Sequence, residues 1–538
     1  MLVLVVTGLN FNTLFNSYAL DDKVVLTENR IVQEGTKGIP EILGSDYLAG
    51  YSGNEHRLSG ARYRPLSLVL FALEYQCFGA NPFVSHLINL LLFTSFTLLL
   101  HRLLRLYIFP NGPPYLAFIT CLLFVAHPVH TEVIANVKSR DEIITFLLLV
   151  LASLALFRYE TERTWSLLAY ALCFYMLALL CKETAITWLG VFPLLYYFCL
   201  QKTLKASLLS VIPFVGITVL YLVLRGSVVG FDTYPVTDIA NSPYLYASVS
   251  EAFATKVYML GMYIMLTVAP FQLCTDYGYN QIPYIQLSSS LFLGTILLLS
   301  FLMVWVILGF RGRSFPVFSV LWFFITLSVG TNFLFDLGAP LAERMLFEPS
   351  LGVCMLMAWT GSLVARNAPV VSRIALTIVL LLYCFKTVTR NSDWKNNETL
   401  FLKDVASSPN SARLNLYACE VFIHKASHEG DEGQRNKYLD KAGYFGRRSA
   451  QIHGKFAYVW LRLGIVNYLR HENRKAADEI LHALKLEPGD RNTLDWARKM
   501  EGEIKGEEAY FISQGNVREA GLCHDKLEEL MNTAHHVH

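Results

Sequence analysis

Three consecutive apolar stretches decide the fold class of the chain: DEIITFLLLVLASLALF at 141–157, WSLLAYALCFYMLALLC at 165–181 and TAITWLGVFPLLYYFCL at 184–200. Each is close to the roughly 20 apolar residues with which an α-helix crosses the hydrocarbon core of a bilayer. The connections between them hold Arg, Lys and Glu, which mark the helix ends. The pattern therefore predicts an all-α, polytopic bundle of membrane helices.

The composition of the whole chain also favours a membrane protein. Of its 538 residues, 54% are hydrophobic and 16% are charged, whereas about 25% of the residues in soluble proteins are charged. The net charge of +2 is too small to favour nucleic-acid binding. Most of the ten cysteines lie inside apolar runs, which predicts small core residues rather than disulfides or metal ligands.

Similar apolar runs lie on both sides of these three stretches. The run 1–15 is short for a span, and we expect it to form a shortened first membrane helix. The other runs lie at 83–108, 115–130, 206–224, 252–271, 288–310, 316–334, 345–365 and 372–388. Together they predict about twelve candidate helices within a membrane domain at residues 1–390.

Cations in the loops predict the orientation of these helices, because cytoplasmic loops are rich in Lys and Arg. With a cytoplasmic start, the first loop 16–82 lies outside. The inside loops then hold Arg102 and Arg105, Arg158 and Arg163, Lys202 and Lys205, Arg311 and Arg313, and Arg366 and Arg373. The last two pairs stay inside only if one earlier segment does not cross, and 252–271 is the best candidate because charges interrupt its start. We therefore predict eleven crossings, with 252–271 on or re-entering the outer face and all residues after 388 outside.

The segment 391–515 has the composition of a soluble helical domain. Its clearest part, 457–490, matches the tetratricopeptide pattern of small residues at helix crossings and Pro after the second helix. The matching residues are Trp460, Leu463, Gly464, Ala476, Ile480, Ala483 and Pro488. A generic helical hairpin is the alternative. Repeats of this kind usually bind an extended peptide or a partner protein.

The neighbouring segments are less regular. The stretch 411–452 resembles a degenerate repeat interrupted by the polar insertion 427–436. Residues 491–515 are expected to form a capping helix, and 516–538 a helical or disordered tail.

Two adjacent carboxylates, Asp21 and Asp22, follow the first apolar run in NSYALDDKVV. Repulsion between them raises the pKa of one, which suits a general base that acts on a hydroxyl group. The second carboxylate is then available to bind an acceptor or a metal. A solvated helix terminus is the structural alternative for both residues.

Two sets of arginines are candidates for binding phosphate, because the guanidinium fork matches phosphate oxygens. Arg64 follows Arg62 in GARYRPLS, where anchoring at lipid headgroups is the alternative. Arg140 follows Lys138 in VKSRDE, at the entrance to an apolar run, where charged groups need partners.

Two adjacent acid–base pairs lie between apolar segments, Lys182–Glu183 in LLCKETAIT and Glu343–Arg344 in GAPLAERMLFEPS. Charges at such places cost free energy unless they pair or bind a ligand. Pairing within each doublet is the structural alternative. The two histidines of AHPVHTEV, His127 and His130, have no third ligand at a diagnostic spacing, so interfacial capping is favoured over a metal site.

Taken in order, the motifs of the chain resemble those of GT-C membrane glycosyltransferases, and among these the transmembrane O-mannosyltransferases that bear tetratricopeptide repeats. The motifs are LDD, YRPLS, HPVHTE followed by SRDE, CKETAIT, AERMLFEPS, and RNSDWKNNETLF before the repeats. The resemblance covers nearly the whole chain. It departs from the family in the short first helix and in the insertion 427–436.

The resemblance implies transfer of a hexose, with mannose expected, from a polyprenyl phosphate to Ser or Thr hydroxyls, with inversion at the anomeric carbon. It places the base at Asp21 or Asp22, and Lys182 and Arg344 near the donor phosphate, with Arg64 and Arg140 in the same set. We expect Asp22 to take the proton and Asp21 to orient the hydroxyl. Glu183, Glu343, His127 and His130 are expected to support the site.

The expected partners are the lipid-linked sugar, an acceptor polypeptide bound by the repeats, and the bilayer. No cofactor and no metal is required by this ligand set. The expected location is the bacterial inner membrane or the endoplasmic reticulum membrane, with the repeats on the periplasmic or lumenal side.

Two rival functions use the same residues differently. A transporter or flippase for a lipid-linked sugar would bind the phosphate without chemistry, but it predicts charges deep inside several helices and paired broken spans. A non-catalytic scaffold would use only its repeats and would leave the buried charges as structural pairs. The concentration of ionisable groups at helix ends favours the enzyme.

Overall fold

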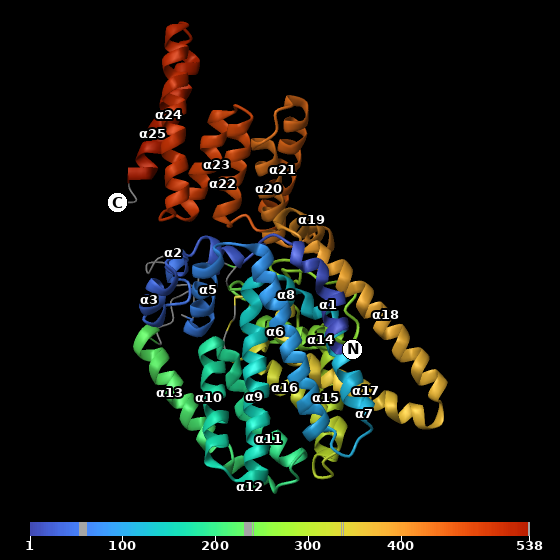
Figure 1. Cartoon of the computed structure of the whole chain (residues 1–538). Helices are drawn as coiled ribbons and strands as arrows, with labels where there is room; N and C mark the ends of the chain where they lie inside the picture. Colours follow the sequence, from blue (N-terminus) through green and yellow to red (C-terminus); the bar gives the residue numbers. More distant parts are fainter. Residues whose placement is uncertain (53–61, 231–238, 240–241, 335, 337, 536–538) are drawn as a thin grey trace. The chain divides into compact units, whose positions relative to one another are not determined.

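The computed structural model describes residues 1–52, 62–230, 239, 242–334, 336 and 338–535, and these fold into helices and loops without a β-strand (Figure 1). The expected all-α class is thereby confirmed. The chain forms two compact units. The first consists of Met1–Thr275 and Tyr284–Leu400, and the second of Asp276–Pro283 and Phe401–His538.

Most of the first unit is made of apolar helices. Their bounds are α1 Leu2–Asn10, α5 Pro65–Phe78, α6 Pro82–Leu103, α7 Pro114–Ala126, α8 Thr131–Ala135, α9 Arg140–Glu162, α10 Trp165–Cys181, α11 Trp188–Phe198, α12 Leu204–Leu209, α13 Ile212–Val229, α14 Val249–Val268, α15 Ser290–Phe310, α16 Phe315–Leu327, α17 Ser350–Asn367 and α18 Pro369–Asp393. Shorter elements are α2 Arg30–Gln33, α3 Ile39–Leu43 and α4 Ala49–Ser52.

Within the described chain, five helical stretches are long and apolar enough to cross a membrane: Pro82–Ile108, Val137–Glu162, Leu204–Val229, Ser290–Phe310 and Pro369–Asp393. The bent pair α7–α8 would make a sixth, and four shorter apolar helices accompany them. The helix α14, which covers most of 252–271, is not among these stretches. The helices fit a multi-pass membrane protein, while the count of eleven crossings stays a prediction.

The expected span 115–130 is broken near its end. Helix α7 stops at Ala126, and the chain continues through Pro128 into α8 after a bend of 56°. Proline lacks the N–H that would continue the helix, so a break at this position is expected physically. After the bend, the HPVHTE motif contacts α6, α9 and α18.

Helix α9 is the central helix of the first unit and packs mainly against α6 and α10. In its apolar window, 72% of the residues are buried, compared with 11% in α15 and in α18. A peripheral membrane helix leaves its apolar side chains to the lipid, so α15 and α18 suit the rim of the bundle. The central position of α9 explains why charges at its start need protein partners.

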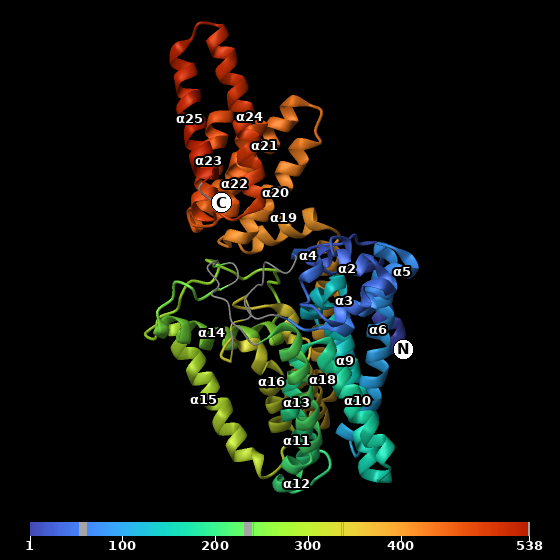
Figure 2. The same ribbon diagram turned by 90° about the vertical axis from the view of Figure 1, so that its left-hand side faces the viewer.

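The described parts of the first loop, 16–52 and 62–82, fold into a small cap with an apolar core of its own. Val25, Leu26, Ile31 and Phe71 pack together there, and Val137, from the turn just before α9, joins them. Figures 1 and 2 show α2, α3 and α5 gathered at the end of the bundle where α6 and α9 begin. The cap therefore places the residues after α1 against the first turn of the central helix.

The second unit is a series of antiparallel helical hairpins. Its helices are α20 Ala412–Ser427, α21 Glu432–Ile452, α22 Ala457–Leu469, α23 Asn473–Leu486, α24 Arg491–Ser513 and α25 Val517–His535, with α19 Asn397–Ser407 before them. The crossing of α22 and α23 is close at Gly464, where an added Cβ would lie 2.6 Å from a side-chain carbon of Ile480. The small residue is therefore needed for the two helices to approach.

Candidate functional site

The acid pair Asp21–Asp22 lies in a tight turn after the first helix. Leu20 has a backbone φ of 52° and donates its N–H to Asn397 Oδ1 at 2.7 Å. The N–H of Ser17 donates to the carbonyl oxygen of Lys395 at 2.8 Å. The RNSDWKNNETLF motif thus fixes the turn that presents the two acids.

The two carboxylates of this turn have different surroundings. Asp22 is fully buried, and its oxygens accept the backbone N–H groups of Ala19 at 3.0 Å and of Lys138 at 2.8 Å. Burial raises its pKa from 3.8 to about 7, although the two N–H donors act in the opposite direction. Asp21 is half-buried, and among the described residues its carboxylate has no hydrogen-bond or ion-pair partner. Both oxygens of the Asp22 carboxylate are therefore occupied by backbone donors, whereas the Asp21 carboxylate is available to accept a proton.

The negative charge of Asp21 acts on two arginines. Burial lowers the pKa of the Arg344 guanidinium, but Glu132 and Asp21 raise it further, so that the net direction is upward. Burial and the positive charges of Arg64 and Arg344 lower the pKa of Arg62, while Glu183 and Asp21 oppose that shift. The unpaired carboxylate therefore interacts electrostatically with one arginine of GARYRPLS, Arg62, and with one arginine of AERMLFEPS, Arg344.

A second group of charges is joined through Asp141 at the start of α9. Arg64 donates from Nη1 to Asp141 Oδ2 at 3.0 Å and from Nε to Glu183 Oε2 at 2.7 Å. Lys182 forms an ion pair with Glu142 and has its Nζ 3.8 Å from Asp141 Oδ1. The side chains of Lys182 and Asp141 are each 1% exposed. The CKETAIT and SRDE motifs are thus parts of one buried network.

The doublet Glu343–Arg344 also pairs with distant residues rather than internally. Arg344 donates from its backbone N to Glu132 Oε2 at 3.0 Å and from Nη1 to Glu132 Oε1 at 2.6 Å. Glu343 accepts the N–H of Cys274 at 2.5 Å. The structural alternative of pairing within each doublet is therefore wrong for both Lys182–Glu183 and Glu343–Arg344. Arg344 keeps 21% of its side chain exposed, which leaves room for a ligand.

Arg140 is placed differently from the other candidate cations. It forms an ion pair with Glu74 and donates to Asn89 Oδ1 at 2.6 Å and to the carbonyl oxygen of Ser85 at 2.9 Å. The side chain is buried and lies 4.7 Å from the ring centroid of Phe71. These contacts join α5, α6 and α9, so Arg140 fastens the three helices to one another.

The two histidines of the bend are buried structural residues. His127 shares a hydrogen bond of 2.7 Å with the carbonyl oxygen of Thr267, and its other ring nitrogen accepts the N–H of Val129. His130 shares one of 2.8 Å with Ser350 Oγ. Their contacts fit the capping interpretation and do not bring them to the acid pair. Among the described residues, no group of three or more His, Cys, Asp or Glu side chains has the arrangement of a metal site.

Sequence reasoning did not single out Glu74 or Asn89, the partners of Arg140. Both lie within long apolar runs, and a buried Glu in α5 is itself a signal, because such a residue is rarely buried without a partner. What the sequence does not provide is the pairing, because Glu74 is 66 residues from Arg140 along the chain.

Known proteins similar to this chain include animal proteins with one shared name. The human protein "Protein O-mannosyl-transferase TMTC3" is 26% identical over 446 residues, which are 77% of this chain and 48% of that protein. The Drosophila melanogaster protein of the same description is 28% identical over 65% of this chain and 45% of its own length. The human "Protein O-mannosyl-transferase TMTC1" is 26% identical over 84% of this chain and 54% of its own length.

The chain thus spans about half the length of these relatives. No family model matches the sequence, and no solved structure matches it. The resemblance drawn from the ordered motifs is nevertheless confirmed: over most of its length, the chain is similar to proteins that are named protein O-mannosyl-transferases.

Proposed function

We propose that the chain is a membrane glycosyltransferase that moves a hexose, with mannose as the expected sugar, from a polyprenyl phosphate to Ser or Thr hydroxyls of a protein. The names of the relatives support transfer of mannose to protein. The observation on which the proposal mainly rests is the unpaired carboxylate of Asp21, whose negative charge acts on Arg62 and Arg344. That arrangement offers a proton acceptor and positive charge for a leaving phosphate within one site.

Asp21 is the proposed base, and this assignment reverses the roles expected from the sequence. Both oxygens of Asp22 already accept backbone N–H groups, so Asp22 positions the turn against Lys138. Asp21 would accept the proton of the acceptor hydroxyl as its oxygen attacks the anomeric carbon. The bond from that carbon to the phosphate oxygen breaks on the opposite side, which inverts the configuration.

The proposed phosphate ligands are Arg344, Arg64 and Arg62. The electron pair of the broken bond stays on the leaving phosphate, and fixed cations beside it stabilise the developing charge. Lys182 is almost completely buried against Glu142 and Asp141, so we assign it the role of positioning Asp141 and thereby Arg64. Arg140 is left out of the ligand set because only 3% of its side chain is exposed, compared with 12% for Arg64 and 21% for Arg344.

We further propose that the hairpins of the second unit are tetratricopeptide repeats that present the acceptor polypeptide. The close approach of α22 and α23 at Gly464 is what the repeat pattern requires. With the acid pair and the repeats on the non-cytoplasmic side, as the loop charges predict, the transfer takes place in the periplasm or the lumen. No cofactor or metal is included in this mechanism, and the membrane bundle is proposed to be of the GT-C type with about eleven spans.

A binding-only role is the second candidate, and one observation favours it. Arg64, Arg344 and Lys182 each pair with a carboxylate, so the network could be stable without a substrate. A flippase or a scaffold with this network would not need a free carboxylate at Asp21.

The test is the mass added to an acceptor peptide when the full chain is supplied with labelled polyprenyl-phosphate hexoses. We expect one hexose per modified Ser or Thr, and a loss of about 10²- to 10⁴-fold in Asp21→Asn, the usual range for removal of a general base. The matched control is Glu41→Gln, an exposed acid of the same cap that pairs with Arg30. An absence of transfer by the unchanged chain with every hexose, or full transfer by Asp21→Asn, would contradict the proposal.

A further inference from the structure

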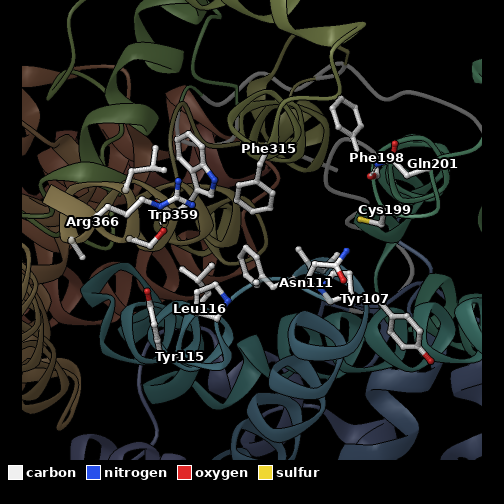
Figure 3. A pocket seen from close by; sticks show the side chains of 18 residues that line it. Tyr107, Asn111, Tyr115, Leu116, Phe198, Cys199, Gln201, Phe315, Trp359 and Arg366 are labelled. Carbon is white, nitrogen blue, oxygen red and sulfur yellow. Dashed lines mark hydrogen bonds between the residues drawn. The ribbon is translucent and has the colours of Figure 1, made fainter. Parts of the chain in front are cut away.

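A cavity lies at the end of the helix bundle opposite the acid pair, and the proposed sugar transfer does not involve it. Asp22 contacts Lys138 just before α9, whereas this cavity lies where α6, α11 and α17 end and where α7 and α16 begin. Its volume is about 500 Å³, within the usual range for small-molecule sites. Figure 3 shows Arg366 beside Trp359 at one side of the cavity and Gln201 at the other.

A second and larger cavity adjoins the first one. It has a volume of about 870 Å³ and lies between α7, α17 and α18, with a lining that is mostly aliphatic. Tyr115, Ser362 and Ala365 line both cavities, so the first cavity is adjacent to the second, mostly aliphatic one. Because α18 is an apolar helix with only 11% of its window buried, the apolar cavity borders the region that lipid would occupy.

The charges around the two cavities are all positive. Arg366 lines the first cavity and Arg373 the second, and no Asp or Glu is among the described lining residues of either. Both arginines are exposed, and among the described residues neither has an ion-pair partner. By contrast, Arg158 at the same end of the bundle pairs with Glu162, and Lys202 pairs with Glu160. The two cavities therefore combine two arginines that lack a paired carboxylate, Arg366 and Arg373, with a mostly aliphatic lining.

We propose that the two cavities together bind one anionic glycerophospholipid of the bilayer. Its phosphate lies at Arg366 and Arg373, because guanidinium groups form strong charge-assisted hydrogen bonds with phosphate oxygens. One of its acyl chains lies between α7, α17 and α18, where burial of apolar surface favours a hydrocarbon chain. The site lies in the leaflet opposite Asp21, and the inference does not depend on sugar transfer.

The test is native mass spectrometry of the full chain in detergent, with phosphatidylglycerol or phosphatidylcholine added. We expect preferential retention of phosphatidylglycerol and a loss of about tenfold in its retention by the Arg366→Gln, Arg373→Gln double variant, in line with the usual contribution of arginines near anionic lipid. Ala365→Trp, which fills the junction of the two cavities, should reduce retention similarly. The matched control is Arg311→Gln, an exposed arginine outside both cavities, and it should bind like the unchanged chain.

The outcomes divide clearly. Equal retention of the two lipids, an arginine double variant that behaves like Arg311→Gln, or undiminished binding by Ala365→Trp would each overturn the proposal. Retention of a polyprenyl phosphate without phosphatidylglycerol would assign the cavities to the carrier lipid and would also overturn it. A thermal unfolding curve of each variant distinguishes loss of the lipid from loss of the fold.

Discussion

Arg140 and Arg158 belong to the same helix, α9, but they lie at opposite ends of it and in different surroundings. Arg140 is buried and pairs with Glu74 of another helix, which ties segments far apart in the sequence. Arg158 is exposed and pairs with Glu162 one turn further along the same helix. The buried pair at the acid-pair end thus ties separate segments of the bundle together, whereas the exposed pair at the other end only marks where the helix stops.

The largest effect on stability is expected from breaking the buried pair. Glu74→Ala leaves the Arg140 guanidinium buried without its carboxylate, which typically costs about 3–5 kcal/mol. The measurement is thermal unfolding of the purified chain in detergent. A melting temperature equal to that of the unchanged chain would mean that water reaches Arg140 and that the acid-pair end is not closed.

The pH dependence of stability should separate Asp22 from the exposed acids. Its pKa is about 7 in the folded chain against 3.8 for the free side chain, so the folded state binds an additional proton between these values. The contribution of Asp22 to the unfolding free energy is therefore complete below pH 3.8 and is lost as the pH rises through 7, by about 1.4 kcal/mol per unit of pKa shift.

Asp22→Asn should accordingly reduce the fall in unfolding free energy between pH 4 and pH 7. Unfolding is followed at several pH values in the unchanged chain, in Asp22→Asn and in the control Glu41→Gln. A slope in Asp22→Asn that matches the unchanged chain would show that the carboxylate titrates normally and is not buried.

The smallest effect is expected at the opposite end of α9. Glu162→Ala removes an exposed pair between residues i and i+4, which contributes about 0.3–0.5 kcal/mol. Its unfolding temperature should lie close to that of the unchanged chain and should become indistinguishable from it in high salt, because exposed pairs are screened. A loss as large as that of Glu74→Ala would remove the contrast between the two ends.

Much of the fold follows from apolar periodicity, and the candidate site follows in part. The runs 165–181 and 288–310 coincide almost residue for residue with α10 and α15, because a long apolar run leaves no alternative to a helix. The bend at Pro128 was not predicted within 115–130, although the proline itself is the signal for it.

The pairing of charges is what the sequence could not provide. Lys182 and Glu183 were weighed as a mutual pair because they are neighbours, but Lys182 is in extended backbone, where successive side chains point to opposite sides. Their partners, Glu142 and Arg64, come from other segments of the chain. The difference between Asp21 and Asp22 has the same origin, since it depends on the backbone N–H of Lys138, 116 residues away.

In the proposed mechanism, Asp21 accepts the proton of the acceptor hydroxyl and Arg344 binds the donor phosphate in the same site. The most direct test measures donor binding and sugar transfer in Asp21→Asn and Arg344→Gln. The account predicts that Asp21→Asn binds the polyprenyl-phosphate hexose within about twofold of the unchanged chain while transfer falls by about 10²-fold or more, and that Arg344→Gln loses binding by about tenfold. Undiminished transfer by Asp21→Asn, or undiminished donor binding by Arg344→Gln, would contradict it.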